Sequence, residues 1–308
     1  MNAESHEREL AVAPHRVASI GVLGAGTMGH GIAQVAAAAG FEVVLRDIDQ
    51  AAVDKGKQSI QRNLLKGIER GKITAQQRDE TLWRITTTIE MKDLAAANLI
   101  IEAAPESLSL KQNLLRECEA ITDSNCIWAT NTSSLSITEI ASVANRPENV
   151  IGMHFFNPVH IMKLVEIVVG QCTSDETKMI VCQVATQMKK EPIVVRDVPG
   201  FASSRLGVTL GLEAMRMVEQ GVASARDIDT AMELGYNHPM GPLRLTDLVG
   251  LDVRLSIAEY LHSKLGTETF RPPDILRRMV SEGKLGKKTG HGFYDWTDQN
   301  EAQPVSTR

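Results

Sequence analysis

The stretch that decides the fold is RVASIGVLGAGTMGHGIAQVAAAAGFEVVLRDID, residues 16–49. Its apolar run at 17–23 predicts a buried strand, and the alanine-rich run that follows predicts a helix that stops at Gly40. A second apolar run at 41–45 predicts another strand. Strand, glycine turn, helix and strand in this order form a βαβ unit of the kind that binds a dinucleotide.

The glycine turn reads Gly24-Ala25-Gly26-Thr27-Met28-Gly29. Gly24 permits the tight turn, Gly26 lets the backbone approach a pyrophosphate, and Gly29 lets the helix pack close to the strand. The helix start then offers N–H groups and a positive dipole end to the phosphates. A crossover without a ligand is the alternative, but the completeness of the unit favours a dinucleotide.

Asp47 follows the second strand, near the spacing of about 20 residues from the first glycine that is expected for the ribose-binding acid. A carboxylate accepts from a ribose 2′-OH and repels a 2′-phosphate, so Asp47 favours NAD over NADP. Arg46 beside it leaves two interpretations open. It is either a phosphate-binding arginine or a solvated charge at a strand end.

The composition limits the class of protein. The chain has 308 residues, 43% hydrophobic and 23% charged, which suits a globular protein of two domains. A net charge of −5 argues against a nucleic-acid or anionic-membrane partner, and no apolar run is long enough to span a bilayer. The four cysteines have no metal-ligand spacing, so we expect free thiols and no metal. They are Cys118, Cys126, Cys172 and Cys182.

The segment 1–15 is predicted to be a flexible arm. It carries three glutamates and lacks both the apolar core of a signal peptide and the acid-poor composition of a transit peptide. We therefore expect a cytoplasmic protein.

Beyond the first unit, the pattern predicts an α/β domain over 16–199 with a doubly wound sheet. Two polar helical stretches, 51–70 and 75–84, form a predicted hairpin inserted after the second strand. Further strands alternate with helical segments such as 108–121 and 136–144. These strands are predicted at 85–89, 99–102, 126–129, 150–154, 164–169 and 193–195.

The pattern changes near Pro199-Gly200, and 200–308 is predicted to be a helical second domain. One helix ends at Gly221, and 245–265 has the periodicity of a second long helix. The apolar content of this domain suggests a surface buried against another subunit, although filling its own core is an equal alternative.

The chemistry is predicted at the end of the first domain, where His154 ends one strand and Glu166 lies in the next. If these strands pair antiparallel around the intervening connection, His154 lies opposite Glu166. Cross-strand neighbours have Cβ atoms about 4.5–5.5 Å apart, which allows an imidazole–carboxylate hydrogen bond. Glu166 would then orient the ring and stabilise its charged form.

From about residue 16 to 296 the chain resembles the 3-hydroxyacyl-CoA dehydrogenase family. The resemblance is carried by GAGTMGHGIAQVAA, IEAAPESLSLK, NTSSL, HFFNPVHIMKLVEIV, DVPGF, HPMGPLRLTDLVGLD and GKKTGHGFYDW. It implies an NAD-dependent dehydrogenase of (S)-3-hydroxyacyl-CoA thioesters and a homodimer formed through the helical domain.

The resemblance also implies roles for individual residues. The catalytic histidine falls on His154, its partner glutamate on Glu166, the substrate-binding serine on Ser133 and a further asparagine on Asn157. In the hairpin, whose family counterpart contacts coenzyme A, Asn63 and Lys66 are the candidate contacts. The implied cofactor contacts are Gly24, Gly26, Thr27, Met28, Gly29, Asp47, Glu106, Lys111 and Asn131.

Two positions depart from the family pattern. Ser204 stands where the family usually has an asparagine, and its shorter side chain donates only one hydrogen bond. This substitution concerns the pose and acyl preference of the substrate, not the class of reaction. His160 stands where proline is common, and no role follows for it from the sequence.

Two other functions remain open. One is a dehydrogenase of a free hydroxy acid or sugar acid, against which the inserted hairpin and HFFNPV argue. The other is a non-catalytic NAD sensor, against which the joint presence of Ser133, His154 and Glu166 argues.

Overall fold

The computed structural model of this chain describes residues 17–297 and 303–304. The predicted arm at 1–15 lies outside the described residues. The chain divides into two compact units, the first ending at Asp197 and the second beginning at Val198. Each unit has its own cluster of buried apolar side chains.

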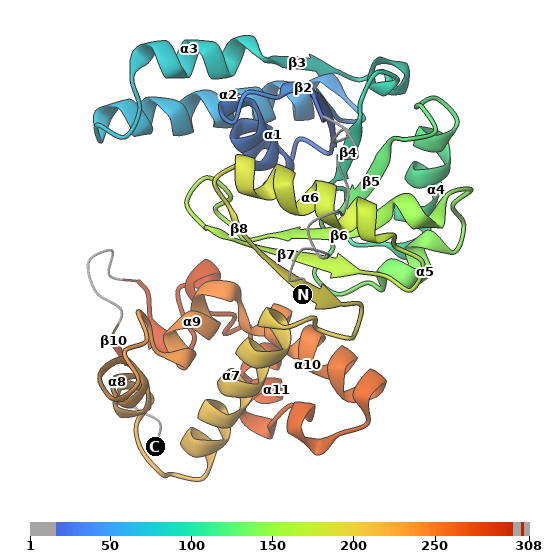
Figure 1. Ribbon diagram of the computed structural model, residues 1–308. Coiled ribbons are helices and arrows are strands. Elements are labelled where there is room, and N and C mark those ends of the chain that lie inside the picture. Colours follow the sequence, from blue (N-terminus) through green and yellow to red (C-terminus); the bar gives the residue numbers. More distant parts are fainter. Residues whose placement is uncertain (1–16, 298–302, 305–308) are drawn as a thin grey trace, which may run out of the picture. The chain divides into compact units, whose positions relative to one another are not determined.

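The first unit is built on a sheet in which eight strands of the described chain follow the order β3-β2-β1-β4-β5-β6-β7-β8 (Figure 1). The strands from β1 to β6 are parallel to one another, whereas β7 is antiparallel to β6 and β8 is parallel to β7. This order confirms the predicted Rossmann-type doubly wound sheet. The strands are β1 (Ser19–Leu23), β2 (Glu42–Arg46), β3 (Ile85–Thr88), β4 (Leu99–Glu102), β5 (Ile127–Thr130), β6 (Val150–Phe155), β7 (Leu164–Val169) and β8 (Glu191–Arg196).

Helices connect most of these strands, and α2 with α3 forms the predicted hairpin between β2 and β3 (Figure 1). Asp49 caps α2 by accepting from the N–H of Ala52. Thr74 and Gln77 cap α3 with reciprocal side-chain bonds, so both helices have defined starts. The elements are α1 (Gly29–Ala38), α2 (Gln50–Glu69), α3 (Ala75–Trp83), α4 (Leu108–Glu119), α5 (Ile137–Ala141), α6 (Asp175–Gln187) and the 3-10 turns η1 (Met91–Leu94) and η2 (Pro147–Asn149).

Glycines allow α1 to pack close to its neighbours. A Cβ on Gly29 would lie 1.6 Å from the carbonyl oxygen of Gly24, and a Cβ on Gly31 would lie 2.8 Å from the Cβ of Val159. Neither position has room for a larger side chain. The helix therefore lies against both the glycine turn and the loop between β6 and β7.

The reversal between β6 and β7 brings two polar residues together inside the sheet. The register sets His154 directly opposite Glu166, which confirms the predicted pairing. All six residues of β6 are buried, and Glu166 has no exposed surface.

The second unit is mainly helical, and its structure corrects one prediction. The segment 245–265 is not one helix, because Gly250 adopts φ +105° and separates α9 (Pro242–Val249) from α10 (Leu251–Leu265). Tyr294 and Asp295 form the short strand β9, which pairs with β10 (Gln303–Pro304). The other elements are α7 (Ser203–Glu219), α8 (Ala225–Gly235), η3 (Glu268–Phe270), α11 (Asp274–Ser281) and η4 (Lys287–Thr289).

Two buried aspartates on α8 and α9 bind the segment 293–296 by hydrogen bonds. Asp247 accepts from the N–H groups of Phe293 and Tyr294 and from the indole of Trp296. Asp229 accepts from the hydroxyl of Tyr294 at 2.7 Å.

Among the helices of the described ranges, we find no segment with the length and apolar character needed to cross a lipid bilayer.

Candidate functional site

The glycine turn lies at the carboxyl end of β1, as the sequence predicts. Gly24 has φ +95°, and a Cβ there would lie 2.7 Å from the carbonyl oxygen of Ala103. A Cβ on Gly26 would meet no atom within 4 Å, so the protein itself does not require glycine there. Thr27 is exposed. Met28 is the N-cap residue of α1, and its side chain makes no capping hydrogen bond. The open space over Gly26 is suited to a ligand that approaches the backbone.

Asp47 lies beside this turn at the end of β2. Its two carboxylate oxygens accept from the N–H of Ala25 at 2.6 Å and of Ile48 at 2.7 Å. Arg46 instead donates from Nε to the carbonyl of Ile89. The carboxylate therefore faces the glycine turn, while the guanidinium is held by the end of the neighbouring β3 segment.

A buried ion pair lies under the carboxyl ends of β4 and β5. Lys111 and Glu102 have no exposed surface, and Nζ of Lys111 lies 2.8 Å and 3.0 Å from the two carboxylate oxygens of Glu102. Glu102 also accepts from the hydroxyl of Thr130 at 2.6 Å. Lys111 thus lies in the protein interior, on a helix whose pattern alone suggests a solvated lysine.

Glu106 connects this ion pair to the loop that carries Ser133. One of its oxygens lies 3.4 Å from Nζ of Lys111. The other accepts from the hydroxyl of Thr132 at 2.5 Å, from the N–H of Ser133 at 3.1 Å and from both polar groups of Ser134. Burial raises the pKa of Glu106, but Lys111 and these donors outweigh it, so the pKa lies below its ordinary value.

The candidate acid–base pair lies on the neighbouring strands. Nδ1 of His154 is 2.8 Å from Oε2 of Glu166, and both residues are buried. The ring of Phe156 lies 4.6 Å from the imidazole, centroid to centroid. Asn131 accepts from the N–H of Phe155 at 2.8 Å and so ties the end of β5 to the end of β6. The pair therefore has a fixed geometry set by strand register.

The remaining predicted residues lie in three places. Asn157 is exposed in the loop after β6, and Ser133 is exposed in the loop after β5. Ser204 belongs to the second unit, at the second position of α7. The first unit thus brings the glycine turn, Asp47, Glu106, Lys111 and Asn131 to the carboxyl edge of its sheet.

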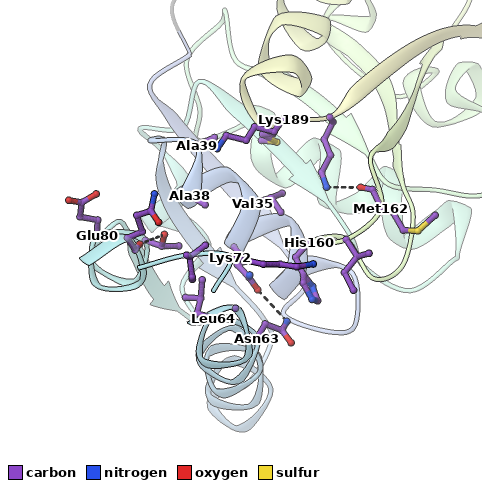
Figure 2. Close-up of a pocket in the computed structure, with 18 of the residues that line it drawn as sticks. Val35, Ala38, Ala39, Asn63, Leu64, Lys72, Glu80, His160, Met162 and Lys189 are labelled. Atoms are coloured by element: carbon purple, nitrogen blue, oxygen red, sulfur yellow. Dashed lines mark hydrogen bonds between the residues drawn. The ribbon is translucent and has the colours of Figure 1, made fainter. Parts of the chain in front are cut away.

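A cavity with a volume of about 460 Å³ lies beside the hairpin, and we call it the hairpin pocket. Asn63 on α2 lies in its wall and donates to Gln34 of α1 at 3.2 Å (Figure 2). Lys66 is exposed on the same helix, outside this lining. The lining comes from α1, α2, α3, the β6–β7 loop and the residues before β8: Gln34, Val35, Ala38, Ala39, Asn63, Leu64, Gly67, Lys72, Ile73, Gln77, Glu80, Thr81, Arg84, His160, Ile161, Met162, Lys163, Met188, Lys189 and Lys190.

Sequence reasoning missed Glu102 and Lys190. Glu102 ends the apolar run LIIE, and an acid in a buried strand is a signal that a buried cation lies nearby. Lys190 is buried and donates from Nζ to the carbonyls of Val159 and Met162, but no local pattern distinguishes it from Lys189.

Comparison with known proteins extends over both units. The family described as 3-hydroxyacyl-CoA dehydrogenase, NAD binding domain, matches residues 19–198, and the family's C-terminal domain matches residues 200–296.

Individual relatives cover nearly the whole chain. A probable 3-hydroxybutyryl-CoA dehydrogenase of Deinococcus radiodurans is 46% identical over 276 residues, which is 90% of this chain and 99% of that protein. The 3-hydroxybutyryl-CoA dehydrogenase of Clostridioides difficile is 43% identical over 277 residues, again 90% and 99% of the two chains. The crystal structure of (S)-3-hydroxybutyryl-CoA dehydrogenase from Ralstonia eutropha has a TM-score of 0.89 at 42% identity, and the match covers 92% of this chain and 100% of that one.

Proposed function

This chain belongs to the 3-hydroxyacyl-CoA dehydrogenase family, and from that premise we propose that it interconverts (S)-3-hydroxyacyl-CoA and 3-oxoacyl-CoA. It is an NAD-dependent dehydrogenase, since the matched domain binds NAD. The observation that carries the proposal is the buried contact of 2.8 Å between His154 and Glu166 in the same unit as the glycine turn.

The residues present fit NAD. The open space over Gly26 leaves room for a pyrophosphate, and the start of α1 has no side-chain cap that would compete for its N–H groups. Asp47 lies next to the turn, where its carboxylate can accept from a ribose hydroxyl. Bound NAD would supply the acceptor for the hydride on C3 of the substrate.

His154 acts as the general base in the oxidation. The imidazole removes the proton of the 3-hydroxyl group as C3 becomes a carbonyl carbon, and in the reverse direction it returns that proton to the oxygen. Glu166, which holds Nδ1, orients the ring and stabilises the imidazolium that forms.

Other residues bind and align the substrate. Ser133 donates from its hydroxyl to the oxygen on C3. Four hydrogen bonds to Glu106 hold the loop 132–134 and so fix the position of this serine. Asn157, exposed in the loop after β6, is a further substrate contact of the first unit. Asn63 and Lys66 bind the coenzyme A part, which suits their position on the hairpin and, for Asn63, in the wall of the hairpin pocket.

The chain forms a homodimer through its helical unit, in line with apolar side chains that are exposed there. Leu206 and Leu234, for example, are 71% and 83% exposed. Sedimentation at micromolar concentration measures the state, and a fully active monomer would contradict it.

Reduction of acetoacetyl-CoA by NADH tests the reaction and the role of His154. The variant His154→Ala should lose about 10²–10⁴-fold in turnover while NADH still binds, because a positioned general acid contributes that factor. Glu166→Gln should lower turnover as well. His262→Ala is the matched control, since this half-buried histidine lies in the second unit, on α10. If the turnover of His154→Ala is near that of the unmutated protein, His154 is a buried structural histidine and not the general base.

The choice of cofactor has its own test. Asp47 should make NAD bind much better than NADP, and Asp47→Ala should relax that preference. Equal affinity of the unmutated protein for the two cofactors would overturn the role of Asp47. Oxidation of free hydroxy acids without activity on acyl-CoA thioesters would favour the alternative substrate class.

A further inference from the structure

The lining of the hairpin pocket combines apolar and basic side chains that proton transfer at His154 does not use. Val35, Leu64 and Ile161 contribute apolar surface. The basic side chains come from the hairpin, from the β6–β7 loop and from the segment before β8, and Glu80 is the acid in the lining. These basic residues are Lys72, Arg84, His160, Lys163, Lys189 and Lys190. Such a lining suits a ligand that is partly apolar and partly anionic.

His160 lies on a turn whose backbone is held from two sides. Lys190 is only 8% exposed, and its Nζ donates to the carbonyls of Val159 and Met162, the latter at 2.7 Å. On the other side, Val159 packs against Gly31 of α1, where even a Cβ would lie 2.8 Å from it. The turn therefore keeps His160 at the rim of the pocket.

The surroundings of His160 are basic. Burial is the largest cause that lowers its pKa, and His30 on α1, Lys190 before β8, and Lys72 and Arg70 at the hairpin turn lower it further. Figure 2 shows Lys72 next to His160. An imidazolium among these charges needs an anion close by.

We propose that His160 is a further substrate-binding residue, which contacts a phosphate group at the nucleotide end of the acyl-CoA thioester. The inference rests on the proposed acyl-CoA substrate. A pocket of about 460 Å³ has the size of a small-molecule site. The apolar wall suits the uncharged parts of the ligand, and His160 with Lys72 suits its phosphates.

Paired substrates test this contact. Acetoacetyl-CoA carries the phosphates, whereas acetoacetyl-pantetheine has the same reacting end and none of them. His160→Ala should raise KM for acetoacetyl-CoA about tenfold, which corresponds to about 1.4 kcal/mol. It should leave kcat unchanged, and it should leave KM for acetoacetyl-pantetheine unchanged.

The pH dependence of KM for acetoacetyl-CoA shows whether the charge of the His160 side chain or only its shape contributes to binding. The imidazole of His160 gains its proton below its ordinary value of 6.5, so KM for acetoacetyl-CoA should fall as the pH decreases through that region. His160→Lys has a permanent charge and should keep a low KM without this dependence. Because the phosphates titrate equally in both proteins, the difference between the two profiles belongs to His160.

Lys178→Ala is the matched control, because this lysine lies on α6 outside the pocket lining. The variant should have the same KM for acetoacetyl-CoA as the unmutated protein. An equal rise in KM for both thioesters after His160→Ala, or no rise for either, overturns the inference. If the unmutated protein reduces both thioesters with the same KM, the inference fails while the proposed function stands. If it reduces neither, the proposed function itself fails.

Discussion

The two units both bury carboxylates, but they stabilise them by different means. In the first unit the ammonium of Lys111 lies between Glu102 and Glu106. In the second, the groups described as bonded to Asp229 and Asp247 are backbone N–H groups, a hydroxyl and an indole, all of them neutral.

The pKa values of Glu106 and of the two aspartates move in opposite directions. The pKa of Glu106 is lowered, because Lys111 and the donors of the 132–134 loop outweigh burial. The pKa values of Asp229 and Asp247 are raised, because burial outweighs their neutral donors. The neutral donors of the two buried aspartates do not offset burial, whereas Glu106 has a cation beside it and a side chain that is 37% exposed.

Removal of the cation should have the largest effect. Lys111→Met leaves the carboxylate of Glu102 buried without its partner, and we expect a loss of about 3–5 kcal/mol in the free energy of unfolding. Urea unfolding measures it, with Lys178→Ala as a control at a half-exposed lysine of α6, and this variant should change little. A loss no larger than that of the control would mean that water or a protonated Glu102 replaces the ion pair.

The matched change in the second unit should cost less. Asp247→Asn replaces a carboxylate whose pKa is already raised. The new amide has only one oxygen to accept from the N–H groups of Phe293 and Tyr294 and from the indole of Trp296, and its NH₂ group faces donors. We expect a loss of about 1–3 kcal/mol, the cost of unsatisfied buried groups. Urea unfolding of both variants gives the comparison, and a larger loss for Asp247→Asn than for Lys111→Met would reverse our ranking.

Acid should affect the two units with opposite sign. The folded pKa of Glu106 lies below its ordinary value of 4.5, so its stabilisation is present above 4.5 and is lost as the pH falls through the folded pKa. The folded pKa values of Asp229 and Asp247 lie above 3.8, so their contribution is largest at low pH and is lost as the pH rises through them.

Mild acid should therefore slow hydrogen exchange in the second unit, after correction for the intrinsic rate, without slowing it in the first. Asp247→Asn should weaken this response. The same response in both units would contradict the assignment of opposite shifts.

Loss of a single hydroxyl should give the smallest effect. Thr130 donates to Glu102 at 2.6 Å, and Tyr294 donates to Asp229 at 2.7 Å. Thr130→Val should cost about 1 kcal/mol, because Lys111 remains on Glu102, and Tyr294→Phe should cost about 2 kcal/mol, because no cation remains. Thermal unfolding of the two variants ranks them, and equal costs would mean that the cation makes no difference to its neighbours.

The fold was predictable where its signals are local. The glycine turn, the strands around it and the His154–Glu166 pairing follow from residue spacing and from alternation within short stretches. The break at Gly250 was not predictable, because a glycine within a helical pattern is tolerated, at a cost of about 1 kcal/mol. Only the packing of the second unit shows that Gly250 adopts φ +105° and ends α9.

The candidate site was predictable only in part for the same reason. The position of Asp47 beside the turn follows from the βαβ pattern. The burial of Lys111 does not, since its partner Glu102 comes from another element and a lysine on a polar helix normally faces solvent. The anchoring role of Lys190 likewise depends on the carbonyls of Met162 and Val159, which lie 28 and 31 positions earlier in the chain.

The antiparallel return of β7 along β6 also has a genetic consequence. The codons for His154 and Glu166 lie twelve apart in the coding sequence, because the two residues are 12 positions apart. An added codon in the loop 157–162 leaves the pairing of the two strands as it is, but it moves the turn that Lys190 holds and that carries His160. An added codon between Leu164 and Glu166 shifts the register by one and turns the carboxylate to the opposite face of the sheet. Inherited changes of length should therefore be absent from the strand between Leu164 and Glu166.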